Sequence, residues 1–394
     1  MSRLIIADQT LFNECIEAFR SSKKEPFIFD PIDNCYCVIL SPFVITQTWE
    51  IGIFTVEPSR EVKLSMYHNA FISYVKINKE VNRLSAPLYS QALSSILSFI
   101  SLRHFKAIKN HYFHNQLPNI TCQEILNTFA VNHPIITCGP SAESWQLDLD
   151  EERIVFDQTK LLIEHLYKIE YKNYSSIMQS IRMVQMSLAN KREDFGLAYQ
   201  LIVASIESVA QLAISRDKVK EKHFKESTWK NKSKTDTDFL ELYKEYKRSR
   251  GGNQYLSERY VQFIMTYFPY KKWNAVLKSP LQEFINKIDY TSLDNFGIKT
   301  SKQEIERSFT GIQIEDLNEN EIKEIIKKTY KYRSEFVHQG KQPPHRDPHS
   351  RNTFFEGTNI FNENTISEQL LPKYDLICNI AKNSILNFMY DIKM

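Results

Sequence analysis

An arginine and a histidine near the C-terminal end, Arg333 and His338, are the residues of this sequence best suited to chemistry. An arginine is always ionised, and a histidine gains and loses a proton near neutral pH. Together they cover the demands of metal-free RNA cleavage, in which the ribose 2′-hydroxyl loses a proton, the leaving 5′-oxygen gains one and the phosphorane charge is stabilised. His338 is thus the candidate for proton transfer, and Arg333 for holding the charge.

These two residues fall on a predicted helix. Arg333 then lies in the middle of an apolar face, with Phe336 and Val337 to either side. A guanidinium there needs an anion or a partner subunit opposite it, because a charge is costly to desolvate. Gly340, followed by Pro343 and Pro344, predicts the end of the helix. The apolar face is defined upstream by four side chains at three- and four-residue spacing: Ile322, Ile325, Ile326 and Tyr330.

The string Tyr330, Arg333-Ser334, Val337-His338 and Gly340 resembles the Apea-like branch of the HEPN superfamily. The resemblance implies a helical domain that acts as a dimeric, metal-independent endoribonuclease with Arg333 and His338 as catalytic residues. It also implies a composite site and products with a 2′,3′-cyclic phosphate and a 5′-hydroxyl. Ser334 departs from the Asn, Asp or His often found beside the arginine in the more active members, which leaves the strength of catalysis open.

A glutamate in an apolar helix extends the resemblance. Glu207 is the one charged residue past the first turn of the predicted helix Phe195–Ile214, and the Apea-like pattern carries a glutamate in such a run. A buried glutamate needs a cation as much as Arg333 needs an anion, so one expectation is that the two face each other. The alternative is that Glu207 lies at the edge of the bundle and meets water. Glu207, Ser334 and Tyr330 are accordingly the predicted supporting residues.

The spacing of the catalytic pair predicts a dimer. On a straight helix, Arg333 and His338 lie about 7.5 Å apart along the axis and about 140° apart around it, too far to share one phosphate. Two copies of the helix packed antiparallel across a two-fold axis would bring both residues of each chain into one cleft. RNA and a second copy of the chain are therefore the expected partners.

Composition sets the limits of this prediction. The chain has 394 residues, 42% hydrophobic residues and a net charge of +3, so nucleic-acid binding must come from a local patch. Six cysteines without a Cys-x-x-Cys pair fit a reducing cytoplasm, with Cys35 and Cys37 on one face of a strand. No signal peptide, bilayer-spanning stretch, cofactor motif or metal-ligand cluster is evident; the nearest apolar stretch, Pro87–Leu102, has the pattern of an amphipathic core helix.

The expected fold is mainly α, with residues 1–150 as a smaller α+β domain before a helical bundle in 151–394. The first domain carries no catalytic motif and is the expected place for a recognition or regulatory trigger. Its predicted elements are a helix at Leu11–Arg20, strands at Phe27–Asp30, Tyr36–Leu40, Phe43–Trp49, Ile51–Val56 and Phe71–Ile77, helices at 85–109 and 121–130, and a strand at Trp145–Leu149.

The second part is predicted to be helical, with an insertion around 269–316 and a loop at 341–365. A basic run, Arg216–Lys234, holds eight lysines and arginines against three acids and is either an RNA-binding stretch or a solvated connection. Candidate RNA contacts are Lys218, Lys220, Lys222, Arg346 and Arg351. The predicted helices are Arg153–Lys168, Tyr174–Asn190, Phe195–Ile214, Asp238–Arg250, one that begins at Glu258, the one that carries Arg333, and Ile366–Ile392.

Three functions remain open at this point. The first is a ribonuclease, for which the resemblance suggests bacterial defence or toxin-like growth arrest. The second is a HEPN-type module that binds RNA, nucleotide or a protein without cutting and uses Arg333 for phosphate contact. The third makes Arg333, Glu207 and His338 a structural polar cluster.

Overall fold

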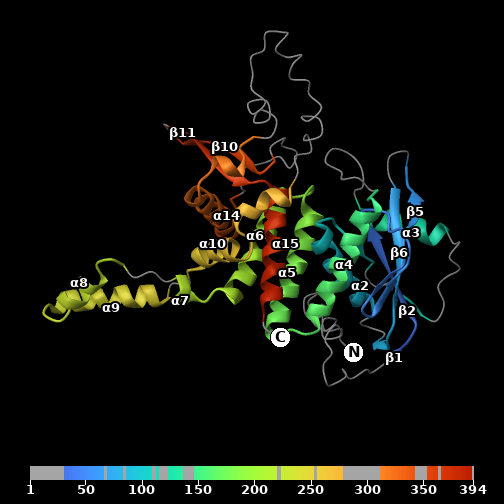
Figure 1. The fold of residues 1–394 in the computed structure, drawn as a ribbon, viewed down its shortest axis with the longest axis horizontal. Helices are drawn as coiled ribbons and strands as arrows, with labels where there is room; N and C mark the ends of the chain where they lie inside the picture. The colour runs from blue at the N-terminus through green and yellow to red at the C-terminus, as the bar shows by residue number, and fades with distance from the viewer. Residues whose placement is uncertain are drawn as a thin grey trace, which may run out of the picture.

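The structure is a computed structural model in which a sheet layer from the N-terminal part lies beside a helical bundle (Figure 1). The predicted class, mainly α with a smaller N-terminal sheet region, is confirmed. The residues that the structure describes are 31–65, 69–82, 86–108, 112–114, 123–135, 146–219, 223–252, 255–277, 311–341, 353–362 and 365–392.

The sheet is antiparallel and is buried on both faces. Along the central strand β2, Cys35, Cys37 and Ile39 pack into the main core, while Val38 and Leu40 pack on the opposite face. The two cysteines thus share one face, as predicted. The strand order is β3-β4-β6-β2-β8, with β5 also paired to β6 and β9 to β2. The strands are β2 (Cys35–Ser41), β3 (Trp49–Ile51), β4 (Phe54–Val56), β5 (Arg60–Lys63), β6 (Asn69–Ile77), β8 (Lys106–Ala107) and β9 (Phe113–His114), and a separate pair joins β1 (Pro31–Ile32) to β7 (Val81–Asn82).

Helices cover both faces of this sheet. Helix α3 (Gln123–Asn132) packs Leu126 and Phe129 on the face of Val38 and Leu40. Helix α2 (Ala86–Ser101) lies between the sheet and the bundle and is buried along its length up to Ile100. Its serines remain compatible with burial because they donate hydrogen bonds, most of them to carbonyls three or four residues earlier in the helix.

The bundle shares one continuous core with the inner face of the sheet. Helix α6, at its centre, is long and apolar enough by composition to cross a bilayer, but more than half of it is buried among the other helices, as in the core of a bundle. The bundle helices are α4 (Leu149–Leu166), α5 (Tyr171–Asn190), α6 (Phe195–Ala213), α10 (Leu256–Tyr267), α14 (Glu319–Gln339) and α15 (Tyr374–Asp391).

Smaller elements surround the bundle. A short α7 (Arg216–Val219) leads to an arm of two helices, α8 (Glu226–Lys232) and α9 (Thr237–Gly252), which extends away from the body (Figure 1). Two 3-10 helices, η1 (Tyr270–Ala275) and η2 (Ile314–Asp316), lie on either side of residues 278–310, which are outside the described residues. The predicted helix Leu11–Arg20 and strand Phe27–Asp30 also lie outside them.

Four predictions for the first 150 residues need correction. The helix predicted at 85–109 ends at Ser101, because Leu102 takes a left-handed backbone (φ 54°) and the chain enters β8. No strand covers 43–48, where the Ser41 hydroxyl accepts a hydrogen bond from the Phe43 N–H and turns the chain out of β2. The strand predicted at Ile51–Val56 is a tight hairpin instead: β3 ends at Ile51, which pairs with Phe54 of β4, and Gly52 at the turn has φ 58°. The strand β5 was not predicted. The strand predicted at Trp145–Leu149 is absent from its described part, since Asp148 is the N-cap of α4.

Two corrections fall near the C-terminus. A β-hairpin of β10 (Phe355–Asn362) and β11 (Thr365–Pro372) occupies part of the predicted loop and the start of the predicted last helix. Helix α15 therefore begins at Tyr374 rather than at Ile366. The Tyr332 hydroxyl of α14 donates a hydrogen bond to Gln369 Oε1 of β11 over 2.5 Å, so the hairpin packs against the helix that carries Arg333.

Candidate active site

Helix α14 is well terminated at both ends. Asn318 accepts hydrogen bonds from the N–H groups of Asn320 and Glu321, and Glu321 accepts one from the Asn318 N–H, a complete capping box. At the other end Gly340 has φ 68° and donates its N–H to Phe336 O over 3.0 Å. The predicted helix end is confirmed, and the helix holds Arg333 and His338 on a fixed backbone.

Arg333 and Glu207 face each other, as one of the two sequence alternatives predicted. Arg333 Nε lies 3.1 Å from Glu207 Oε2, with the arginine side chain 23% exposed and the glutamate side chain 6% exposed. The two atoms are buried but do not meet the angular criterion of a hydrogen bond. The pair is therefore a part-buried ion pair that crosses from α14 to α6.

Two further side chains hold the other carboxylate oxygen of Glu207. Gln211, one turn further along α6, donates a hydrogen bond from Nε2 to Oε1 over 3.1 Å, and the Tyr330 hydroxyl lies 3.5 Å from the same oxygen. Burial, and then the negative charge of Glu207, raise the pKa of Tyr330 to about 12. Tyr330 therefore stays a neutral donor. Sequence reasoning found Tyr330 but missed Gln211, whose four-residue spacing from Glu207 was the available signal.

Arg333 lies at an open hollow of about 540 Å³ between α14 and the pair α5 and α6. This hollow is called the Arg333 hollow below, and both polar and apolar side chains line it. It is lined by Ser176, Met183, Ala204, Glu207, Ser208, Gln211, Leu212 and Arg333.

His338 does not line the Arg333 hollow and is exposed in the last turn of α14. Val337 beside it is 49% exposed, so the apolar face does not continue past Arg333 as predicted. The buried residues of α14 end at Tyr332, because the last turns of the helix extend beyond the bundle core. Ser334 is half-buried. Within one chain the structure thus brings Glu207, Tyr330 and Arg333 together and leaves His338 apart.

Arg259 of α10 is a positioning residue that sequence reasoning did not single out. Its Nε donates to Ile214 O over 2.7 Å, and its Nη2 donates to Gln211 O. These carbonyls belong to the last turn of α6, where backbone acceptors have no partner inside the helix. Arg259 therefore fixes the end of the helix that presents Glu207 and Gln211.

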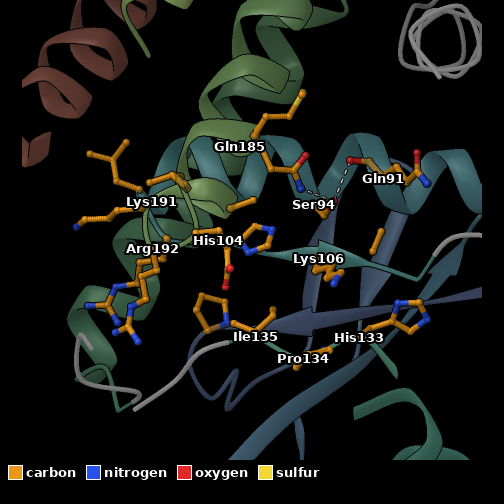
Figure 2. A pocket seen from close by; sticks show the side chains of 18 of the residues that line it. Gln91, Ser94, His104, Lys106, His133, Pro134, Ile135, Gln185, Lys191 and Arg192 are labelled. Carbon is orange, nitrogen blue, oxygen red and sulfur yellow. Dashed lines mark hydrogen bonds between the residues drawn. The ribbon is translucent and has the colours of Figure 1, made fainter. Parts of the chain in front are cut away.

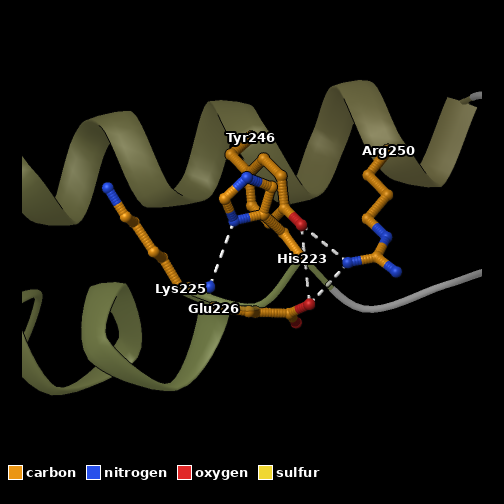
Figure 3. A network of polar contacts seen from close by, with 5 residues as sticks. All are labelled: His223, Lys225, Glu226, Tyr246 and Arg250. Atoms are coloured by element: carbon orange, nitrogen blue, oxygen red, sulfur yellow. Dashed lines mark hydrogen bonds and ion pairs between the residues drawn. The ribbon is translucent and has the colours of Figure 1, made fainter.

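Residues 223–234 of the basic run lie in the arm. His223 stacks on Trp229 with ring centroids 4.4 Å apart, and Trp229 packs edge-on against Tyr246 of α9 at 5.1 Å. Arg250 Nη1 lies 2.5 Å from Glu226 Oε2 and 2.6 Å from the Tyr246 hydroxyl (Figure 3). Trp229 thus packs the two arm helices together, while Phe224 of the same run is 80% exposed.

The remaining site predictions divide by what the structure describes. Lys218 is exposed on α7. Lys220, Lys222, Arg346 and Arg351 lie outside the described residues. Within the described ranges, no group of three or more His, Cys, Asp or Glu side chains is placed to hold a metal ion.

Comparisons with known proteins add no relative. No protein-family model matches the chain, and neither a curated protein nor a solved structure matches it. The resemblance to the Apea-like family rests on the residues quoted above and stays a prediction.

Proposed function

We propose that the protein is a metal-independent endoribonuclease of HEPN type that acts as a homodimer. The observation that carries the proposal is the placement of Arg333. Its side chain is part-exposed at an open hollow and is fixed from behind by the buried carboxylate of Glu207, while His338 stands exposed at the end of the same helix.

The proposed chemistry depends on which atoms of Arg333 and His338 are accessible to RNA. Among the described residues, Glu207 is the ion-pair partner of Arg333, and it contacts Nε. The two terminal nitrogens of the guanidinium are therefore available to a phosphate. The guanidinium would stabilise the charge of the phosphorane. His338 would take the 2′-hydroxyl proton or deliver a proton to the leaving 5′-oxygen.

The dimer supplies what a single chain lacks. The last turn of α14 exposes both Val337 and His338, so this helix end is accessible to a second chain. Antiparallel packing of two such helix ends would bring His338 of one chain toward Arg333 of the other. The composite site is thus the arrangement in which both groups reach one phosphate.

A second candidate, phosphate binding without cleavage, is favoured by the position of His338, which does not line the Arg333 hollow. In this function the Arg333 hollow binds RNA or nucleotide, and His338 has no chemical role.

The deciding experiment incubates the purified full chain with mixed RNA in excess chelator, beside His338→Ala and the matched control Gln339→Ala. Gln339 is the exposed neighbour of His338 in the last turn. We expect cleavage by the wild-type and Gln339→Ala proteins, with 2′,3′-cyclic phosphate ends, and none by His338→Ala. RNA binding without cleavage by the wild type supports the second candidate instead. Activity that needs added magnesium or manganese would contradict the metal-independent mechanism.

A further inference from the structure

A second cavity, called the basic pocket below, lies between the sheet layer and the bundle. Its volume is about 590 Å³. Helix α2 contributes Gln91 and Ser94, and α5 contributes Gln185 (Figure 2). The turn into β8, the end of α3 and the turn after α5 complete the lining. The pocket is distinct from the Arg333 hollow, with which it shares no lining residue.

The lining is strongly cationic. Among the lining residues that the structure describes, Glu193 is the one carboxylate, and Lys191 pairs with Asp375 over 2.9 Å. Among the described residues, the five lysines and arginines of the lining outnumber the two acids Glu193 and Asp375 by three. The five cations of the lining are Arg103, Lys106, Arg182, Lys191 and Arg192.

His104 is a buried neutral histidine among the cations of the pocket. Burial, with the positive charges of Lys106 and Arg182, lowers the pKa of this histidine to about 4. Burial also lowers the pKa of Lys106. The imidazole is therefore neutral at pH 7 and offers one donor and one acceptor among fixed cations.

The floor of the pocket is rigidly bonded. Gln185 donates from Nε2 to Ser94 Oγ over 3.0 Å and to Phe105 O over 2.8 Å, and its Oε1 accepts from the Ser95 hydroxyl over 2.5 Å. Arg182 also donates to Gln185 Oε1. A pocket whose polar floor is fixed in this way is preorganised for a ligand, because little side-chain freedom remains to be lost on binding.

We propose that the basic pocket binds a small ligand of nucleotide size that carries two or three phosphates. Its volume lies within the range of small-molecule sites, about 300 to 1,000 Å³, and leaves room for more than a lone phosphate. Several separate cations suit a chain of phosphates better than a single anionic group. The apolar part of the lining, which includes Leu102, Ile135 and Leu188, provides a surface for a base or another flat ring.

Binding is measured by calorimetry on the full chain with three probes: ATP, AMP and inorganic pyrophosphate, without added magnesium. We expect ATP to bind more tightly than both AMP, which lacks the phosphate chain, and pyrophosphate, which lacks the ring. Equal affinity for pyrophosphate and ATP would overturn the nucleotide-sized ligand. Absence of binding by all three at about 1 mM would overturn the site altogether.

Variants locate the site. Arg192→Glu, on the exposed turn after α5, and Lys106→Gln are expected to weaken ATP binding roughly tenfold each. The control Lys160→Glu changes an exposed lysine on α4 outside the pocket and should leave binding unchanged. Melting curves confirm that each variant is folded, and should Lys106→Gln fail to fold, Arg192→Glu decides alone. ATP binding that is unchanged in folded Arg192→Glu overturns the assignment. None of these measurements depends on RNA cleavage.

Discussion

Arg333 Nε lies 3.1 Å from Glu207 Oε2 without hydrogen-bond alignment, so charge rather than a directed bond joins α14 to α6. The other carboxylate oxygen keeps Gln211 and Tyr330 as neighbours. Glu207 therefore keeps polar neighbours when Arg333 is removed, and the Arg333 side chain is partly exposed to solvent within the pair. This reduces the energetic cost of breaking the pair below that of a fully buried one.

Arg333→Ala is expected to lower the free energy of unfolding by about 1 to 3 kcal/mol, because it leaves the buried Glu207 carboxylate without a cation. Arg333→Ala combined with Glu207→Gln should recover part of that loss but no RNA cleavage. Chemical denaturation of both proteins, beside the exposed-site control Lys331→Ala, measures it. A double variant no more stable than Arg333→Ala would show that the pair does not stabilise the fold.

Mixing Arg333→Ala and His338→Ala chains should restore part of the RNA cleavage that each lacks alone. If each site takes its arginine from one chain and its histidine from the other, a mixed dimer keeps one complete site and cleaves RNA. If both residues of a site come from the same chain, no complete site forms and the mixture stays inactive. Cleavage assays of the mixture, with sedimentation to establish the dimer, provide the measurement. A protein that cleaves as a monomer would rule out the composite site.

His104 should destabilise the protein in mild acid. Its pKa is about 4 in the folded state against an ordinary 6.5, so between these values the unfolded chain binds more protons. Stability is complete above pH 6.5 and falls by about 1 to 3 kcal/mol as the pH drops to about 4. His104→Gln should show a smaller loss over this window in denaturation curves, and an equal loss would contradict the assignment. The charged or titratable groups that share the pocket are Arg103, Lys106, His133, Arg182, Lys191, Arg192 and Glu193.

Arg250→Ala should loosen the arm and leave the bundle intact. The Arg250 side chain is 10% exposed and contacts Glu226 and Tyr246, so its loss removes the ion pair between α8 and α9 and leaves the 3.5 Å contact of the Tyr246 hydroxyl with Glu226. Limited proteolysis should cut the arm faster, while the main melting transition stays in place. Arg248→Ala, at an 82% exposed position of the same helix, is the matched control. Equal cleavage of both variants would contradict the role of Arg250.

Local patterns predicted much of the fold. The three-to-four spacing of apolar residues located α5, α6 and α14. A buried glutamate needs a cation and a buried arginine needs an anion, which made the contact of Glu207 with Arg333 one of the two predicted alternatives. The β10–β11 hairpin was missed because apolar and polar residues do not alternate regularly along Phe355–Asn362 or Thr365–Pro372, so the usual period-two signal of a strand is weak there. The basic pocket could not be predicted from the sequence, because Lys106 lies on β8 and Arg182 on α5, and the packing of both elements on α2 brings them to one cavity.

Helix α5 forms a wall of both cavities. Met183 lines the Arg333 hollow and its neighbour Arg182 lines the basic pocket, so the two sites lie on different faces of the same turn of α5. If a ligand displaces α5, thermodynamic reciprocity requires that RNA at the hollow change the affinity of the pocket ligand by the same factor as the ligand changes RNA affinity. If α5 stays fixed, neither ligand changes the affinity of the other. Titrating ATP with and without a bound RNA fragment measures this factor.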